Sequence, residues 1–557
     1  MTAQESPGDA AESSVDNTGS LLKSSAVMAA GTVVSRVTGF LRVVVIMAAL
    51  GSGPLSNAYN TANNAPYSIY ELFLGGVLSA VLVPLFVRAN KRSLDEGTVY
   101  AQRLLTLVAL VLLGLAVLSV VGAPAIMSLI ANRMAGDQRE VGIAFLRYLL
   151  PQILFLGIGA VLIAVLQSRR RFAAPMWVPV LNNLTVITTG LVFAYVVHGQ
   201  PTPQTITPGE TALLGIGTSA GIVVQTLAFI PPLWRAGFRP RPRLGFGKLG
   251  LGAIGRMGTW TIVFVLSNLA QLFVVTNIAG AVDRALPDDS AINYGYTPYQ
   301  NAFTVFALPH AIAAVSVITA LLPRMSSHAA DEMFHLVRDD LSTGVRLSAA
   351  LIVPAAAAMI ALGEPIGLTI FNHGHYTAGN AGYTGLVLAA FALGLVPFSI
   401  FQLLLRVFYA LQDTRTPALV NLVGTLSTIA IGAIGYLVLP LRYVVIMLAL
   451  SYGLGYLVNT VLAAHILSRR LGGVDARKIL GSLARMVTAA APAAVVAWFA
   501  ATGITAAVGR HSLGGAVAVV AGGSIILLGF VILARVLRVT EVQTLAGTFR
   551  DRIGRGR

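Results

Sequence analysis

The chain has 557 residues, of which 56% are hydrophobic and only 11% are charged, and it contains no cysteine. Soluble domains contain about 25% charged residues, so this composition excludes a soluble multidomain enzyme. The lack of cysteine excludes disulfides, thiolate metal sites and cysteine nucleophiles. The formal net charge is +16, but the cations cluster between long apolar runs, which favours a membrane protein and argues against a nucleic-acid partner.

Apolar runs long enough to cross a bilayer recur along almost the whole chain, bounded by charge clusters and by Gly, Pro or Asn turns. We predict an all-α polytopic membrane protein with about fourteen transmembrane helices. The spans fall at residues 25–49, 66–87, 104–131, 145–167, 175–197, 212–234, 257–282, 297–323, 347–371, 383–412, 417–439, 443–467, 486–508 and 513–534. The spans at 175–197 and 297–323 contain several polar residues and are expected to face protein or a cavity.

The lysines and arginines alternate between successive loops. If the N-terminus is cytoplasmic, about 29 cations lie on the cytoplasmic side and about six on the other. Because cytoplasmic loops of membrane proteins are enriched in Lys and Arg, we predict a multi-pass protein of the plasma (inner) membrane with both termini in the cytoplasm.

Proline, glycine and glutamine landmarks recur at offsets of 239 to 246 residues, which indicates an internal duplication. The pairs are Pro84 with Pro323, Gly122 with Gly363, Pro151 with Pro397, and Gln167 with Gln412. About six helices fit in one unit, so the copies are parallel, and transporters with such repeats bind substrate between them.

The predicted organisation is two six-helix lobes followed by two C-terminal helices. Its segments are a disordered cytoplasmic tail (1–24), an N-lobe (25–236), a basic cytoplasmic linker (237–256), a C-lobe (257–470), the last two spans (471–538) and a basic cytoplasmic tail (539–557).

Three arginines lie inside predicted spans: Arg36 and Arg42 in the first, and Arg406 in the tenth. An arginine at mid-membrane costs about 2.5–3.5 kcal/mol on insertion scales, so it normally faces a wet cavity or a partner. A guanidinium binds phosphate through two parallel hydrogen bonds. Arg36 and Arg42, about 9 Å apart along the helix axis, suit a diphosphate; a structural pairing is the alternative, and Arg406 is close enough to a helix end to snorkel.

Glu71 is the main acidic residue within a predicted span, about one and a half turns from the start of the second. It is a candidate counter-ion for Arg42, ligand for a coupling cation, or proton carrier. Asparagines within spans are expected to hydrogen-bond neighbouring helices. These are Asn182, Asn183, Asn268, Asn277, Asn421 and Asn459.

Several of these segments together resemble the MviN/MurJ lipid II flippases of the MOP exporter superfamily. SRVTGFLR (Ser35 to Arg42) resembles the family's first-helix signature, and GSGPLSNAYNTANNAP (Gly51 to Pro66) resembles the loop that follows it. Three further segments resemble signatures of the family: RRFAAPMWVPVLNN, IFNHGHYTAGN and RVFYALQDTRTPALV, which begin at Arg170, Ile370 and Arg406.

The resemblance implies fourteen helices in two lobes around a V-shaped cavity, and alternating access that carries the undecaprenyl-diphosphate-linked peptidoglycan precursor from the inner to the outer leaflet. It implies that Arg36 and Arg42 engage the diphosphate and that the last two helices hold the lipid tail. The implied partners are lipid II, membrane lipids and proteins of cell-wall synthesis or division. No cofactor is expected, apart from Na⁺, H⁺ or the membrane potential as the driving force.

The chain departs from the family pattern at four positions. Asn57 replaces an aspartate, Tyr70 falls where the family has an arginine, Gly75 replaces a glutamate, and Thr304 falls near a further arginine. Asn57, Tyr70, Glu71 and Arg406 are therefore further candidate site residues, and the cavity is expected to be less cationic than in the family pattern.

Other functions stay open at this point. A related exporter of lipid-linked oligosaccharides or of drugs and cations is one alternative, although the arginines of the first span disfavour a cationic substrate. A non-transporting scaffold for cell-wall synthesis is another. An enzyme is not expected, because the acidic pairs Asp95–Glu96 and Asp288–Asp289 lie in predicted loops and no His/Asp/Glu cluster has ligand spacing.

Overall fold

A computed structural model describes residues 30–71, 94–169, 171, 173–245, 251–286 and 292–543. The described residues form helices and connecting turns, with no β-strand among them. This confirms the predicted all-α fold. The predicted tail at 1–24, the C-terminal tail beyond residue 543 and most of the second predicted span lie outside the described residues.

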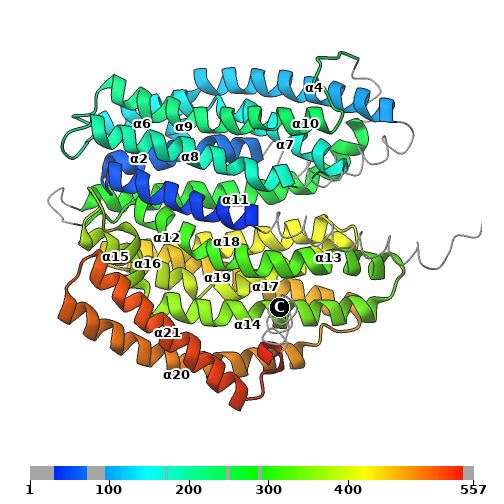
Figure 1. The fold of residues 1–557 in the computed structure, drawn as a ribbon, viewed down its shortest axis with the longest axis vertical. Coiled ribbons are helices and arrows are strands. Elements are labelled where there is room, and N and C mark those ends of the chain that lie inside the picture. Colours follow the sequence, from blue (N-terminus) through cyan, green and yellow to red (C-terminus); the bar gives the residue numbers. More distant parts are fainter. Residues whose placement is uncertain are drawn as a thin grey trace, which may run out of the picture.

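The N-terminal part of the chain forms a series of helices that begins with Ala30–Leu50. The next helices are α2 (Pro54–Tyr70), α4 (Leu94–Val121), α5 (Ala123–Ile130), α6 (Gly136–Leu149), α7 (Gln152–Ser168), α8 (Ala173–Val196), α9 (Pro208–Ala228) and α10 (Ile230–Arg235). In Figure 1 they occupy the upper part of the molecule.

The remaining helices occupy the middle and lower parts of Figure 1. They are α11 (Leu251–Ala285), α12 (Tyr296–Pro309), the π-helix η4 (His310–Ala314), α13 (Val315–Ala330), α14 (Phe334–Ala361), α15 (Gly363–Phe371), α16 (Ala378–Ala392), α17 (Leu395–Ala410), α18 (Arg415–Val438), α19 (Leu441–Leu471), α20 (Ala476–Val508) and α21 (Ser512–Val536).

Among the described residues, eleven helices are long and apolar enough to cross a membrane, or twelve if the bent pair α16–α17 is one span. Two predicted spans are not in that count. The span at 66–87 lies mostly outside the described residues, and the span at 297–323 is divided among α12, η4 and α13. The structure is therefore consistent with about fourteen spans.

The same neighbour relations occur in both halves of the chain. α2 packs on α6 as α12 packs on α16, α4 packs on α7 as α14 packs on α17, and α8 packs on α9 as α18 packs on α19. Helix lengths also agree, because α4 and α14 each have 28 residues and α8 and α18 each have 24. This agreement is what a duplication predicts; the exact lobe boundaries stay a prediction.

One predicted loop is wrong. The segment Gly51–Pro66 was expected to be a loop, but α2 begins at Pro54 and includes most of it. Proline is favourable at the first position of a helix because the N–H group that proline lacks would have no hydrogen-bond partner there. Most polar residues of the segment are buried against other helices, and Asn57 and Asn60 find hydrogen-bond partners there in place of water.

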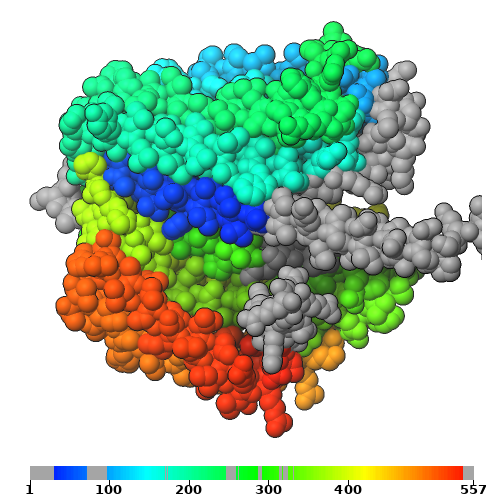
Figure 2. All heavy atoms as spheres, in the orientation of Figure 1, coloured from blue at the N-terminus to red at the C-terminus, as the bar shows by residue number. Residues whose placement is uncertain are grey.

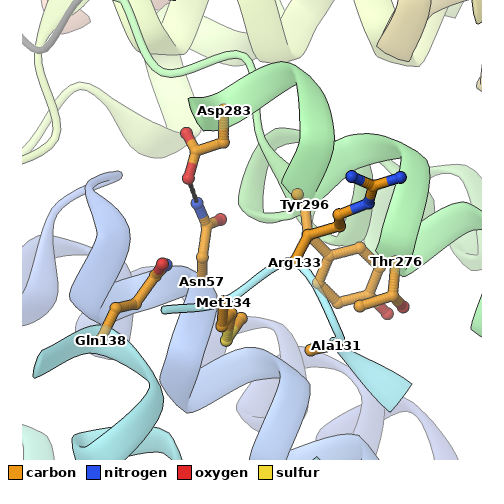
Figure 3. A pocket seen from close by; sticks show the side chains of 9 residues that line it. Asn57, Ala131, Arg133, Met134, Gln138, Thr276, Asp283 and Tyr296 are labelled. Carbon is orange, nitrogen blue, oxygen red and sulfur yellow. Dashed lines mark hydrogen bonds between the residues drawn. The ribbon is translucent and has the colours of Figure 1, made fainter. Parts of the chain in front are cut away.

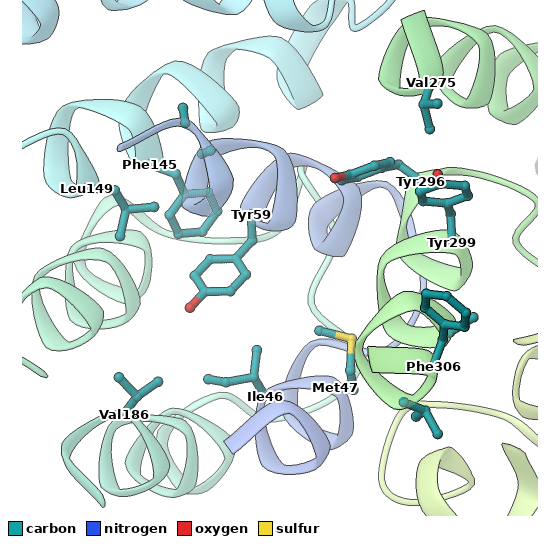
Figure 4. Close-up of a cluster of buried hydrophobic side chains, with 14 of the residues drawn as sticks. Ile46, Met47, Tyr59, Phe145, Leu149, Val186, Val275, Tyr296, Tyr299 and Phe306 are labelled. Atoms are coloured by element: carbon teal, nitrogen blue, oxygen red, sulfur yellow. The ribbon is translucent and has the colours of Figure 1, made fainter. Parts of the chain in front are cut away.

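Aromatic and aliphatic side chains from both halves form the main core (Figure 4). Tyr59 of α2 packs edge-on against Phe145 of α6 with ring centroids 5.4 Å apart, and its hydroxyl lies 2.9 Å from that of Thr218 in α9. Tyr299 and Phe306 of α12 continue the core into the other half. This packing fixes α2 and α12, which lie at the border between the two halves.

The helix Ala30–Leu50 lies along that border, and the surface is recessed between it and the C-terminal helices (Figure 2). The predicted asparagine contacts are confirmed for Asn183, Asn268, Asn277 and Asn421. The side-chain oxygens of Asn182 and Asn459 have no hydrogen-bond partner among the described residues. The Asn183 side chain of α8 donates to the Ser35 carbonyl at 3.0 Å, and that of Asn421 in α18 donates to Asn268 of α11 at 3.1 Å. Equivalent helices of the two halves are thus joined in the same way.

Candidate functional site

A network of hydrogen bonds joins the two halves at one end of the border (Figure 3). Asn57 of α2 is only 2% exposed, and its amide nitrogen donates to the Asp283 carboxylate of α11 at 2.8 Å. Its amide oxygen accepts from the backbone N–H of Thr297 at 2.8 Å and from the Thr297 hydroxyl at 2.7 Å. The first turn of α12 has no side-chain cap of its own, so Asn57 supplies one from the other half.

Two more asparagines extend this network along α2. Asn60 donates to the Thr297 hydroxyl at 3.3 Å, and Asn64 donates to the Tyr296 hydroxyl at 3.1 Å. Positions 57, 60 and 64 lie on one face of a helix because residues three and four apart are neighbours. We call the contacts of Asn57, Asn60 and Asn64 with α11 and α12 the asparagine seam.

The turn after α15 closes the same end. Gly374 has a positive φ of 58°, and a Cβ added there would lie 2.3 Å from the Ala48 carbonyl oxygen, so only glycine fits. The backbone N–H of His375 donates to that carbonyl at 3.0 Å. The end of the helix Ala30–Leu50 is therefore held by the second half as well.

A second cluster along the border is cationic. Arg36 of the first helix is exposed, while Arg406 of α17 is half-buried and its Nε has no hydrogen-bond partner among the described residues. Both guanidinium groups lie close enough to His310 to interact with it electrostatically. None of the ion pairs in the described part of the chain includes Arg36 or Arg406. We call Arg36, His310 and Arg406 the cation cluster.

His310 was not among the residues predicted from the sequence. It is the first residue of the π-helix η4, directly after Pro309, and its Nδ1 lies 3.1 Å from the Ser399 hydroxyl of α17. π-Helical turns inside α-helices occur frequently at functional sites. A histidine after a proline, inside a long apolar run, was the available signal. Asp283, near the end of another predicted span, was missed in the same way.

Arg42 does not lie with Arg36. It is half-buried, and it interacts electrostatically with the Tyr59 hydroxyl of α2, inside the first half. Six residues separate the two arginines, which turns their side chains about 120° apart. The structure thus separates the two arginines that the sequence groups together and brings Arg406 near Arg36 instead.

Glu71 follows the last residue of α2, so it lies about 25 Å along the helix from Pro54. Its depth in the membrane stays a prediction. Glu71 interacts electrostatically with Tyr70 of its own helix and with Tyr456 of α19. In the described residues no ion pair joins it to Arg42.

Two other departures from the family pattern, Tyr70 and Thr304, make contacts within their own helices. The Tyr70 ring lies 6.0 Å from that of Tyr67, and the Thr304 hydroxyl donates to the Gln300 carbonyl one turn earlier in α12. Gly75 lies outside the described residues. Within the described part of the chain, no group of three His, Asp or Glu residues is arranged to hold a metal ion.

The fold defines a class of protein. It is an all-helical fold of two halves with the same neighbour relations, joined at one end by the asparagine seam, and solved membrane transporters have the same fold. A solved "multidrug resistance MATE family transporter of the MOP superfamily" in an inward-facing conformation matches with a TM-score of 0.60 over 78% of this chain and 94% of its own, at 16% identity. A solved "Lipid II flippase MurJ, inward closed conformation" matches with a TM-score of 0.69 over 92% of this chain and 99% of its own, at 18% identity.

The family model described as "Lipid II flippase MurJ" matches residues 46–514, and the chain belongs to this family. A "Probable lipid II flippase MurJ" of Synechocystis is 28% identical over 86% of this chain and 87% of its own length. Another of the same name, from Rhizobium meliloti, is 28% identical over 72% of each chain. The chain is therefore an integral inner-membrane protein of a transporter family, not an enzyme.

Proposed function

We propose that this protein moves lipid II, the undecaprenyl-diphosphate-linked peptidoglycan precursor, from the inner to the outer leaflet by alternating access. The family membership supports lipid II as the substrate. The observation that carries the mechanism is the cation cluster, because Arg36 and Arg406 come from opposite halves and neither has an acidic partner among the described residues. Two guanidinium groups without counter-ions suit a diphosphate, which offers several acceptor oxygens.

The charge distribution supports an orientation with both termini in the cytoplasm. In that orientation the asparagine seam lies toward the outer leaflet and the cation cluster is reached from the inner leaflet. The present arrangement then corresponds to a protein that faces inward. Export requires that the hydrogen bonds of Asn57 with Asp283 and Thr297 break while the cytoplasmic ends of the two halves approach each other.

We further propose that transport uses no organic cofactor and is driven by Na⁺, H⁺ or the membrane potential. Glu71 is the proposed coupling residue, since it is an acidic residue directly after α2 and has no ion-pair partner among the described residues. An acid within a span is expensive to bury, so it normally serves an ion or proton pathway. Membrane lipids and proteins of cell-wall synthesis or division are the proposed partners.

The test is depletion of the protein in its host, followed by measurement of lipid II exposed on the outer leaflet. Complementation by the wild type should restore exposure. Arg36→Ala should insert normally and yet lower exposure about tenfold or more, because a charge-assisted hydrogen bond contributes about 1.5–3 kcal/mol. Membrane insertion is checked by quantifying the protein in the membrane fraction.

Unchanged exposure after depletion, in a host without a second flippase, would contradict the proposal and favour another lipid-linked oligosaccharide as the substrate. Full activity of Arg36→Ala would contradict the assignment of the cation cluster while leaving lipid II as the substrate.

A further inference from the structure

A cavity of about 200 Å³ lies in the second half, between α11, α12 and α19. Its lining consists of aromatic rings and side-chain amides with a few aliphatic groups: Asn268, Gln271, Leu272, Val275, Tyr296, Tyr299, Gln300, Phe303, Tyr452 and Tyr456. None of the described residues in this lining is charged. Pockets for drug-sized ligands measure about 300–1,000 Å³, so this cavity fits a single ring-sized neutral group.

The aromatic residues form a continuous wall on one side of the cavity. The rings of Tyr452 and Tyr456 lie 4.8 Å apart, and that of Phe303 lies 5.5 Å from Tyr452. Aromatic faces carry partial negative charge and attract the weakly positive C–H groups of a flat, non-aromatic ring. A pyranose sugar presents such C–H groups on its ring faces and hydroxyl or acetamido groups around its edge.

The amides supply hydrogen-bonding groups for the edge of such a ring. Among the described residues, Gln271 has no hydrogen-bond partner for its side chain. Gln300 accepts from the Tyr296 hydroxyl at 2.9 Å, and its amide nitrogen has no partner in the same part of the chain. A side-chain amide offers two donors and an acceptor, which matches the mixed donor and acceptor character of sugar hydroxyls. These two glutamines are therefore available to a ligand.

The cavity lies next to the cation cluster. The ring centroid of Phe398 lies 4.7 Å from that of His310 and 4.9 Å from that of Tyr456. Phe398 thus contacts both His310 of the cation cluster and Tyr456 of the cavity wall. In lipid II the first sugar is attached directly to the diphosphate, so the spacing suits consecutive parts of one substrate.

We propose that this cavity is a saccharide subsite, which holds a sugar ring of the lipid-linked precursor through Gln271, Gln300 and the wall of Tyr452 and Tyr456. The proposal rests on the proposed function, because it takes the cation cluster as the diphosphate site. It gives the protein a means to distinguish a glycosylated carrier lipid from the bare carrier, which the cation cluster alone does not provide.

The test compares three ligands on the full-length protein in lipid nanodiscs: undecaprenyl diphosphate, the same lipid carrying the disaccharide without its peptide, and lipid II. Gln271→Ala and Gln300→Ala should each weaken binding of both glycosylated lipids about fivefold, as expected for one lost hydrogen bond. Neither should change binding of undecaprenyl diphosphate. Gln225→Ala, a glutamine of α9 outside the cavity, is the matched control.

Equal loss for all three ligands would overturn the proposal, since it would mean that the variants disturb the fold or the diphosphate site. Unchanged binding of all three would overturn it too, and so would an effect confined to the ligand that carries the peptide. If the wild type binds none of the three lipids, the proposed function fails instead, and that result is distinguishable from failure of the subsite.

Discussion

The asparagine seam and the cation cluster both lie on the border between the two halves. The polar groups of the seam have hydrogen-bond partners in the other half, whereas those of the cluster lack acidic partners among the described residues. At the seam, Asn57 uses its amide nitrogen on Asp283 and its amide oxygen on Thr297, and it is almost completely buried. At the cluster, Arg36 is exposed and the Nε of Arg406 is without a partner in the described part of the chain.

The seam therefore holds the two halves together, whereas the cation cluster is available to bind a ligand. A satisfied network stabilises the contact between the halves and leaves nothing for a ligand. An unpartnered guanidinium inside a membrane protein is unfavourable on its own, and an anionic ligand relieves that cost. The two regions therefore predict opposite responses to mutation.

The largest effect is expected at the cation cluster. Arg406→Ala should reduce lipid II exposure on the outer leaflet about tenfold or more, because it removes one of two charged donors for the diphosphate. The control is Arg415→Ala, which removes a neighbouring arginine that lies over the Trp260 ring at 5.2 Å, outside the cluster. Equal losses in both variants, measured at matched expression, would remove the distinction between the cluster and any other arginine.

A smaller effect, and of the opposite kind, is expected at the seam. Asn57→Ala leaves the buried Asp283 and Thr297 groups without their partner, which should weaken the contact by about 1–3 kcal/mol. The protein should then populate an arrangement with the seam open, while substrate binding at the cluster is retained. Asn57→Asp should open the seam further, since it places a second carboxylate beside Asp283.

The chain has no cysteine, so this opening is measurable with two introduced ones. Spin labels at Ala135→Cys and Ala285→Cys, both exposed and on opposite sides of the seam, should report a longer distance in the Asn57 variants. Asn132→Ala, an exposed asparagine at the same end, should leave the distance unchanged. A seam that stays closed in Asn57→Asp would show that other contacts hold the halves together.

Glu71 directly follows α2, the helix that carries the seam, and its variant sharpens the comparison. Glu71→Gln keeps the shape of the side chain but cannot bind a cation through a carboxylate or release a proton. We expect the maximal rate of lipid II transport in proteoliposomes to fall severalfold and its dependence on pH or sodium to disappear. A rate that keeps the wild-type dependence on both ions would assign Glu71 a structural role.

The smallest effect is expected away from the border, at the turn between α17 and α18. Burial raises the pKa of the Asp413 carboxyl, but hydrogen bonds from Thr416 and the Arg470 guanidinium outweigh it, so the pKa is lowered overall. A lowered pKa stabilises the folded protein above the usual Asp range, and this stabilisation is lost as the pH falls through the lowered pKa. Asp413→Asn should cost about 1 kcal/mol or less, because Arg470 is partly exposed.

Thermal unfolding in detergent at neutral and acidic pH checks this expectation. The wild type should lose stability relative to Asp413→Asn as the pH falls, while lipid II transport per molecule stays the same in both. A large loss of transport in Asp413→Asn would mean that this turn takes part in the movement of the halves.

The sequence alone determined the class of protein and most of its helices. Twenty-residue apolar runs must form helices in a bilayer, since no other local structure satisfies the backbone there. The repeated landmarks at Gly122 and Gly363 correspond to the breaks α4–α5 and α14–α15. The family followed from ordered motifs such as SRVTGFLR and RVFYALQDTRTP, and the family model confirms it.

Only the tertiary structure decided which polar residues meet. Arg36 and Arg42 share a helix and a motif, yet they face different surroundings, and Arg36 lies with Arg406, 370 positions later in the chain. The segment beginning at Pro54 was predicted to be a loop from its resemblance to a loop of the family, but it is helical, and its asparagines find partners in Asp283, Tyr296 and Thr297. Local patterns record how apolar a segment is; pairing between distant segments depends on how the two halves pack.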